Sequence, residues 1–161
     1  MIFDTHAHYD SEQFDEDRET LLASMKEAGV GMIVNVAASY ESCFEVPKLA
    51  EKYPFMYAAV GVHPDEVGDL NEETFARMKE QFKLDKVVAV GEIGLDYYWH
   101  KEEAEHKQQQ EMFRAQMDIA REEKLPFMIH SRDAAEDTLE IVKEYMKKDK
   151  SGGIIHCFSY S

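Results

Sequence analysis

The chain has 161 residues, 44% of them hydrophobic and 32% charged, and its formal net charge at pH 7 is −15. This composition is typical of a globular protein and excludes a low-complexity or disordered chain. No apolar run reaches the roughly 18 residues of a membrane span and no signal-peptide pattern is present, so we expect a cytoplasmic protein without a membrane partner; the acidic balance argues against nucleic-acid binding through a broad basic patch.

Strand-like and helix-like runs alternate along the chain. Strands are predicted over residues 2–5, 32–36, 56–60, 87–90, 126–129 and 153–158. Helical spacing predicts helices over residues 15–28, 40–52, 72–81, 106–123 and 133–147. Pro47 leaves the second helix uncertain, and the last helix is expected to bury Leu139, Val142 and Met146. Six β units joined by five helices imply a parallel sheet with right-handed crossovers.

The first strand run leads into a His-Ala-His sequence. Side chains alternate along a strand, so His6 and His8 point to the same face and suit a common metal ion, with Asp4 on that face as a candidate second-layer partner. A pair of histidines with ordinary hydrogen bonds is the alternative for this motif taken alone.

Three later strand runs also end in metal-binding side chains. Glu92 follows the run at 87–90, His130 the run at 126–129, and His156 the start of the last run. A packed core gains nothing from polar groups placed repeatedly at the same end of successive strands, so the set favours a metal site. A β/α barrel places its chemistry at this end of its strands.

The two cysteines, Cys43 and Cys157, form no CxxC pair. We expect both to be reduced, with Cys157 a buried and inert thiol that points away from the metal.

Five motifs carry a family resemblance: Asp4-Thr5-His6-Ala7-His8, Gly61-Val62-His63-Pro64, Gly91-Glu92-Ile93-Gly94-Leu95-Asp96-Tyr97, His130-Ser131-Arg132-Asp133-Ala134 and His156-Cys157-Phe158-Ser159. Together they resemble the TatD-type metal-dependent deoxyribonucleases of the amidohydrolase superfamily, in the family's motif order along the whole chain. The resemblance implies a TIM-type (β/α) barrel and two divalent metal ions, Mg²⁺, Mn²⁺ or Zn²⁺. His6 and His8 would bind the first ion, Glu92 would bridge the two, and His130 with His156 would complete the second site.

A complete barrel of eight units takes typically about 200 to 250 residues, whereas this sequence stops after the sixth strand. We therefore expect one partial barrel domain over residues 1–161, without the family aspartate that completes the first metal site and accepts a proton from water. An open sheet edge would favour self-association or a retained C-terminal fragment.

Other residues leave alternatives open. His63 would contact substrate or make a structural hydrogen bond before Pro64, and Arg132 would bind phosphate or pair with Asp133 or Glu136. The cluster Tyr97-Tyr98-Trp99 could stack on a nucleobase, although packing against the barrel rim is favoured. Asp96 and Tyr97 are expected in a loop after Glu92.

The leading functional hypothesis is metal-dependent phosphodiester hydrolysis, namely a DNase with 3′ to 5′ exonuclease action on single-stranded DNA or 3′ ends. Bound cations would attract the phosphodiester locally although the surface is acidic. The alternatives are an amide or ester hydrolase on the same metal-dependent barrel, and a non-catalytic fragment.

Overall fold

The computed structural model describes residues 1–147 and 152–160. The strands are β1 (Ile2–Ala7), β2 (Val30–Val36), β3 (Met56–Val60), β4 (Val87–Asp96), β5 (Phe127–Arg132) and β6 (Gly153–Ile155). The α-helices are α1 (Arg18–Ser24), α2 (Ser42–Lys52), α3 (Glu72–Lys79), α4 (Glu103–Glu123) and α5 (Ala135–Met146). Short 3₁₀ turns lie at Glu12–Phe14, Pro64–Asp69 and Glu80–Lys83. None of the helices in these ranges is both long and apolar enough to cross a bilayer.

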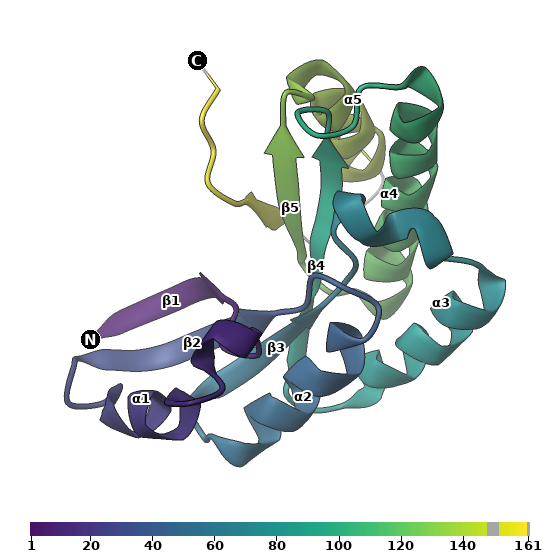
Figure 1. Ribbon diagram of the computed structural model, residues 1–161. Helices are drawn as coiled ribbons and strands as arrows, with labels where there is room; N and C mark the ends of the chain where they lie inside the picture. Colours follow the sequence, from purple (N-terminus) through teal and green to yellow (C-terminus); the bar gives the residue numbers. More distant parts are fainter. Residues whose placement is uncertain (148–151, 161) are drawn as a thin grey trace.

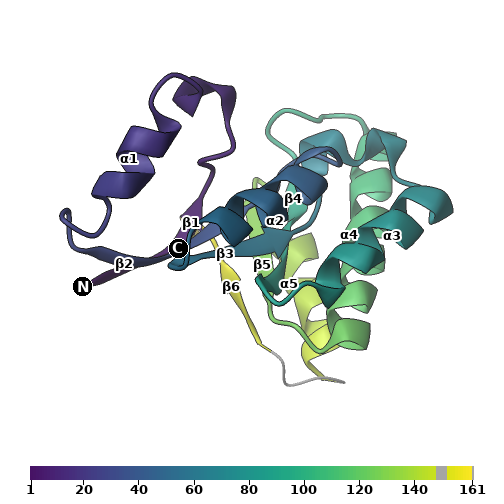
Figure 2. The same ribbon diagram turned by 90° about the horizontal axis from the view of Figure 1, so that it is seen from below.

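The strands form one parallel sheet in the order β1-β2-β3-β4-β5-β6. The sheet curls into a half-barrel, and the helices lie along its outer face (Figure 1). Seen from below, α1 and α2 cover the part near β1 to β3, while α4 and α5 cover β4 and β5 and α3 lies beside α4 (Figure 2). This is the predicted TIM-type architecture, present as six of its β units. It gathers the carboxyl ends of the strands at one rim.

Two apolar layers hold the sheet in place. The larger layer lies between the sheet and the helices and includes Leu22, Met56, Phe113 and Ile141, all at most 1% exposed. The smaller layer consists of buried residues on the strands alone: Val34, Val36, Ala59, Ala89 and Met128. The sulfur of Met128 lies 2.9 Å from Nδ1 of His6, so this inner layer directly supports the end of β1.

Strand β4 is longer than the sequence predicts. The sequence predicts a strand over residues 87–90, where the apolar run ends, yet the strand continues to Asp96. Two glycines in this continuation permit close packing of β5: a Cβ at Gly91 would lie 2.6 Å from Cβ of Met128, and a Cβ at Gly94 would overlap the carbonyl oxygen of His130. Gly94 also has a φ of 143°, a region that favours glycine. These residues act as close-approach positions within the strand.

The helix predicted over residues 40–52 is confirmed and continues through Pro47. Two other expectations about the elements were wrong in part. Helix α1 is shorter than residues 15–28, although Leu22 and Met25 are buried as its spacing predicts. Strand β6 ends at Ile155, so the following residues form an irregular segment and Cys157 is exposed instead of buried.

The predicted buried face of α5 is also wrong. Leu139 is 52% exposed and Met146 is 43% exposed, whereas Thr138 and Ile141 are buried. The helix packs on β5 through the latter pair, which leaves its other apolar face beside the open edge of the sheet.

Candidate metal centre

The carboxylate of Glu92 lies at the centre of a cluster of histidines at the carboxyl rim. Its side chain is only 4% exposed. Oxygen Oε2 lies 3.3 Å from Nε2 of His6 and 3.7 Å from Nε2 of His8. Oxygen Oε1 lies 3.2 Å from Nδ1 of His130 and 3.7 Å from Nε2 of His156. The structure thus brings all five predicted metal-binding residues together, with one histidine pair at each carboxylate oxygen.

The pair at Oε2 comes from β1 and the residue after it. The Nε2 atoms of His6 and His8 are 3.0 Å apart. Nδ1 of His8 donates a hydrogen bond to the carbonyl of Val36 at 2.8 Å, which fixes the ring with Nε2 toward Glu92. Asp4 does not support either ring: its carboxylate accepts the backbone N–H of His6 at 3.1 Å.

The pair at Oε1 comes from strand β5 and from the residue that follows β6. Nε2 of His130 lies 3.0 Å from Oδ2 of Asp96, which leaves Nδ1 facing Glu92. Asp96 is the last residue of β4 and is 1% exposed, so its predicted place in a loop was wrong. The signal that locates it is alternation: Glu92, Gly94 and Asp96 share one face of an extended strand. A carboxylate behind a metal-binding imidazole is a common second layer in metal sites.

His63 and His156 complete the surroundings of Glu92. Nδ1 of His63 accepts the backbone N–H of Asp65 at 3.2 Å, so the structural hydrogen bond of the turn is present. His63 also forms a group with Glu92 and His130 whose candidate ligand atoms, including a ring nitrogen of His63, all lie within 4.8 Å of one another. The ring of His156 stacks on that of His6, with centroids 3.8 Å apart, and so connects the two histidine pairs.

The charges of these groups follow from their contacts. Burial alone would raise the pKa of Glu92, but hydrogen bonds from His130 and His6 hold that pKa well below its usual range. Burial would lower the pKa of His130, whereas its hydrogen bonds to Glu92 and Asp96 raise it above its ordinary value. Burial lowers the pKa of His63 and His156, and neighbouring histidines reinforce the effect. A charged carboxylate therefore faces neutral imidazoles at these two positions near neutral pH.

This donor set fits divalent metal ions. Two groups have ligand atoms within 4.8 Å of one another, His6-His8-Glu92 and His63-Glu92-His130, and they share the Glu92 carboxylate. Nδ1 of His8 donates its hydrogen to a backbone carbonyl, so Nε2 carries the lone pair of the ring. This lone pair faces Nε2 of His6 and the carboxylate of Glu92. Imidazole nitrogen with carboxylate oxygen suits Zn²⁺, Mn²⁺ and related ions.

In the part of the chain that the structure describes, Arg132 does not form the ion pair with Asp133 or Glu136 that is one of its two sequence-based alternatives. It is exposed, and its guanidinium lies over the ring of Tyr98, 3.9 Å from the centroid, and 5.5 Å from that of Trp99. Within residues 1–147 and 152–160 it forms no ion pair, so pairing with Asp133 or Glu136 does not occur. Trp99 is 64% exposed, so the prediction that the aromatic cluster packs against the rim is wrong for this residue.

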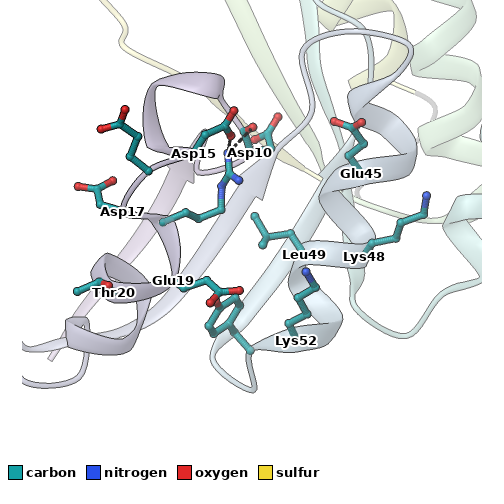
Figure 3. A pocket seen from close by; sticks show the side chains of 12 residues that line it. Asp10, Asp15, Asp17, Glu19, Thr20, Glu45, Lys48, Leu49 and Lys52 are labelled. Atoms are coloured by element: carbon teal, nitrogen blue, oxygen red, sulfur yellow. Dashed lines mark hydrogen bonds and ion pairs between the residues drawn. The ribbon is translucent and has the colours of Figure 1, made fainter.

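A separate cleft of about 550 Å³ lies between the segment around α1 and helix α2. Figure 3 shows acidic side chains, among them Asp10 and Asp17, on one side and Lys48 and Lys52 on the other. It contains none of the histidines around Glu92. Its charges include both signs and are open to solvent, so we assign the metal-binding chemistry to the cluster at the rim.

Comparison with known proteins gives consistent matches over nearly the whole chain. The family described as TatD related DNase matches residues 3–161. An uncharacterized metal-dependent hydrolase of Bacillus subtilis, YabD, is 44% identical over 100% of this chain and 62% of its own length. The 3′-5′ ssDNA/RNA exonuclease TatD of a Rahnella species is 34% identical over 98% of this chain and 59% of its own length.

A solved structure agrees with the sequence matches. The crystal structure of YJJV, a TatD homolog from Escherichia coli, superposes with a TM-score of 0.88 at 32% identity, over 99% of this chain and 61% of that chain. The chain therefore spans about three fifths of the length of the relatives that it matches.

Proposed function

The chain belongs to the TatD related DNase family, and from this membership we propose that its Glu92 cluster is a two-metal centre for hydrolysis of phosphodiester bonds in single-stranded DNA, proceeding from 3′ ends. The observation that carries the proposal is the division of the histidines between the two oxygens of one buried carboxylate. A carboxylate with one set of ligands at each of its oxygens can bridge two neighbouring divalent ions. The printed name of the Rahnella relative supports a single-stranded nucleic acid as the substrate.

Each residue of the cluster has a distinct task. Glu92 remains deprotonated because its hydrogen bonds outweigh its burial, so it supplies one oxygen to each side. The carbonyl of Val36 orients His8, and Asp96 orients His130, so both rings present a nitrogen to the centre without rearrangement. When bound, two divalent ions would activate a water molecule and neutralise charge on the attacking and leaving oxygens.

The surroundings of the cluster suit an anionic substrate locally despite the acidic surface. Arg132 lies two residues beyond His130 on the same face of β5, and its guanidinium is exposed at the rim. Guanidinium groups bind phosphate with two parallel hydrogen bonds. We assign Arg132 to the phosphate of the substrate and His63 to the wall of the centre.

The proposal is tested with the purified chain, a 3′-labelled single-stranded oligonucleotide and Mg²⁺, Mn²⁺ or Zn²⁺, beside a panel of simple esters and amides. We expect metal-dependent release of mononucleotides that stops on addition of chelator. Glu92→Gln should abolish release, whereas Glu111→Gln, a matched change on the exposed side of α4, should leave it unchanged. Turnover of the esters alone would favour the alternative hydrolase, and a folded, metal-binding chain without any turnover would favour the non-catalytic fragment.

A further inference from the structure

An exposed group of aromatic and cationic side chains lies beside the metal centre, and we name it the rim platform: Tyr98, Trp99 and Arg132. The rings of Tyr98 and Trp99 meet edge to face, with centroids 4.6 Å apart. The guanidinium of Arg132 covers Tyr98 at 3.9 Å and leaves Trp99 64% exposed. An indole with an open face beside a cation is a surface on which a flat, electron-rich ring can stack.

The rim platform is attached to the metal centre through Asp96. Its Oδ1 accepts the backbone N–H groups of Tyr98 at 2.9 Å and Trp99 at 3.2 Å, while its Oδ2 binds Nε2 of His130 at 3.0 Å. One buried carboxylate thus fixes both the aromatic turn and a metal-binding ring. The position of the turn relative to the centre is therefore set by these three short contacts and not by a long loop.

Strand β5 provides the second attachment. In the register between β4 and β5, the backbone of Arg132 lies opposite that of Asp96, and the backbone of His130 lies opposite that of Gly94 two residues earlier. Two residues along a strand span about 6.6 Å, so Arg132 lies one short step outside the metal-binding histidine on the same face. A phosphate at the centre would have its neighbouring nucleotide at the rim platform.

We propose that the rim platform binds an unpaired nucleobase next to the phosphate held at the centre, with the base stacked on Trp99 and Arg132 bound to the adjoining phosphate. The inference rests on the proposed nucleic-acid substrate and specifies how it is recognised. Stacking on a side chain requires a free base face, which a base inside a duplex does not offer. Selection of single strands then follows from the platform, without hydrogen bonds that would read the sequence.

The chain offers a direct probe, because Trp99 is its only tryptophan. The fluorescence of the chain is titrated with a phosphorothioate hexadeoxyadenylate, which resists hydrolysis, in Mg²⁺ and again in chelator. The matched ligand is an abasic hexamer with the same number of phosphorothioate groups. We expect the base-bearing hexamer to quench the fluorescence at concentrations at which the abasic hexamer does not. Equal responses to the two hexamers in both conditions would overturn the proposal.

Variants separate stacking from structural support. Trp99→Ala should raise the Kd for a labelled single strand by roughly 5- to 150-fold, the range expected for one stacked base, and should leave the Kd for the abasic hexamer unchanged. Trp99→Phe should restore most of the affinity. Phe3→Ala, at a 54% exposed aromatic residue at the opposite end of β1, should have no effect. A Trp99→Ala chain that binds both hexamers like the wild type would contradict the proposal.

The outcome does not depend on turnover. Quenching by bases without metal-dependent hydrolysis would retain the platform and reject the proposed function. Hydrolysis without base-dependent quenching would retain the proposed function and reject the platform.

Discussion

The two oxygens of Glu92 face surroundings that are built in different ways. At Oε2, His6 comes from β1 and His8 from the residue directly after it, and a backbone carbonyl orients His8. At Oε1, His130 and His156 come from different elements, and a buried side chain, Asp96, orients His130. The first side is therefore a local feature of β1, whereas the second depends on the packing of β4, β5 and β6.

The difference also appears in exposure and in the number of nearby donors. His156 follows β6, whose three residues are all exposed, while His130 lies within β5 between two neighbouring strands. His63 approaches the same side as His130, so the described residues offer three histidines there and two at Oε2. The side at Oε1 therefore has more candidate ligands, but one of them, His156, follows β6, the strand whose residues are all exposed.

Loss of the shared carboxylate is expected to have the largest effect, because it removes a ligand from both sides. Glu92→Gln keeps the size of the side chain but removes its charge, so the chain should bind neither ion tightly and lose metal-dependent hydrolysis altogether. Its far-UV circular dichroism should match that of the wild type. Undiminished hydrolysis in Glu92→Gln, with Glu111→Gln as the control, would show that the two sides do not share this ligand.

Asp96→Asn should affect one side only. The amide still fits beside the backbone N–H groups of Tyr98 and Trp99, but it no longer provides a charged partner for Nε2 of His130. Loss of such a second-layer partner costs roughly 10- to 100-fold in metal affinity or activity. Calorimetric titration should show one weakened and one unchanged metal-binding step. Equal weakening of both steps would contradict the separation of the two sides.

We propose that a second copy of the chain binds at the edge next to His156. A groove lined by Leu139, Val142, Ile155 and Phe158 lies beside β6, and each 100 Å² of apolar surface buried there would contribute about 2.5 kcal/mol. The double change Leu139→Lys and Phe158→Ser should therefore shift the chain toward monomer in light scattering. A wild-type chain that is a monodisperse 18.6 kDa monomer with a cooperative thermal transition would contradict this expectation.

The smallest effect concerns the protonation of His130 in chelator. Its hydrogen bonds to Glu92 and Asp96 raise its pKa, so the contacts of the imidazolium stabilise the fold fully below about pH 6.5 and are lost as the pH rises through the folded pKa. NMR titration of His130 should give a midpoint above about 6.5, and Asp96→Asn should lower it. A midpoint that is unchanged by Asp96→Asn would show that this carboxylate does not act on the ring.

The same contrast explains which features could be predicted from the sequence. The His6-Ala7-His8 pair is visible because strand alternation is a local rule, and the order of strands and helices follows from hydrophobic spacing. Asp96 was misplaced because the apolar run that marks the strand ends at Val90, whereas Gly91 and Gly94 let the strand continue by allowing β5 to pack closely on β4. Such tertiary contacts leave no periodic signal.

Errors near the end of the chain have a related cause. The face of α5 with Leu139 and Met146 was expected to be buried because it is apolar, but the described residues place no element over it. The exposure of Cys157 follows from the early end of β6 at Ile155. Hydrophobic spacing predicts that a face is apolar, but it does not identify the element that covers it.

The most direct test of a shared carboxylate is to locate the ions themselves. Crystals of the chain grown with Zn²⁺ would be measured at the zinc absorption edge. The bridging proposal predicts two anomalous peaks on either side of Glu92, one within about 2.0–2.2 Å of nitrogens of His6 and His8 and the other at such distances from His130. A single peak, or two peaks of which only one touches Glu92, would contradict it.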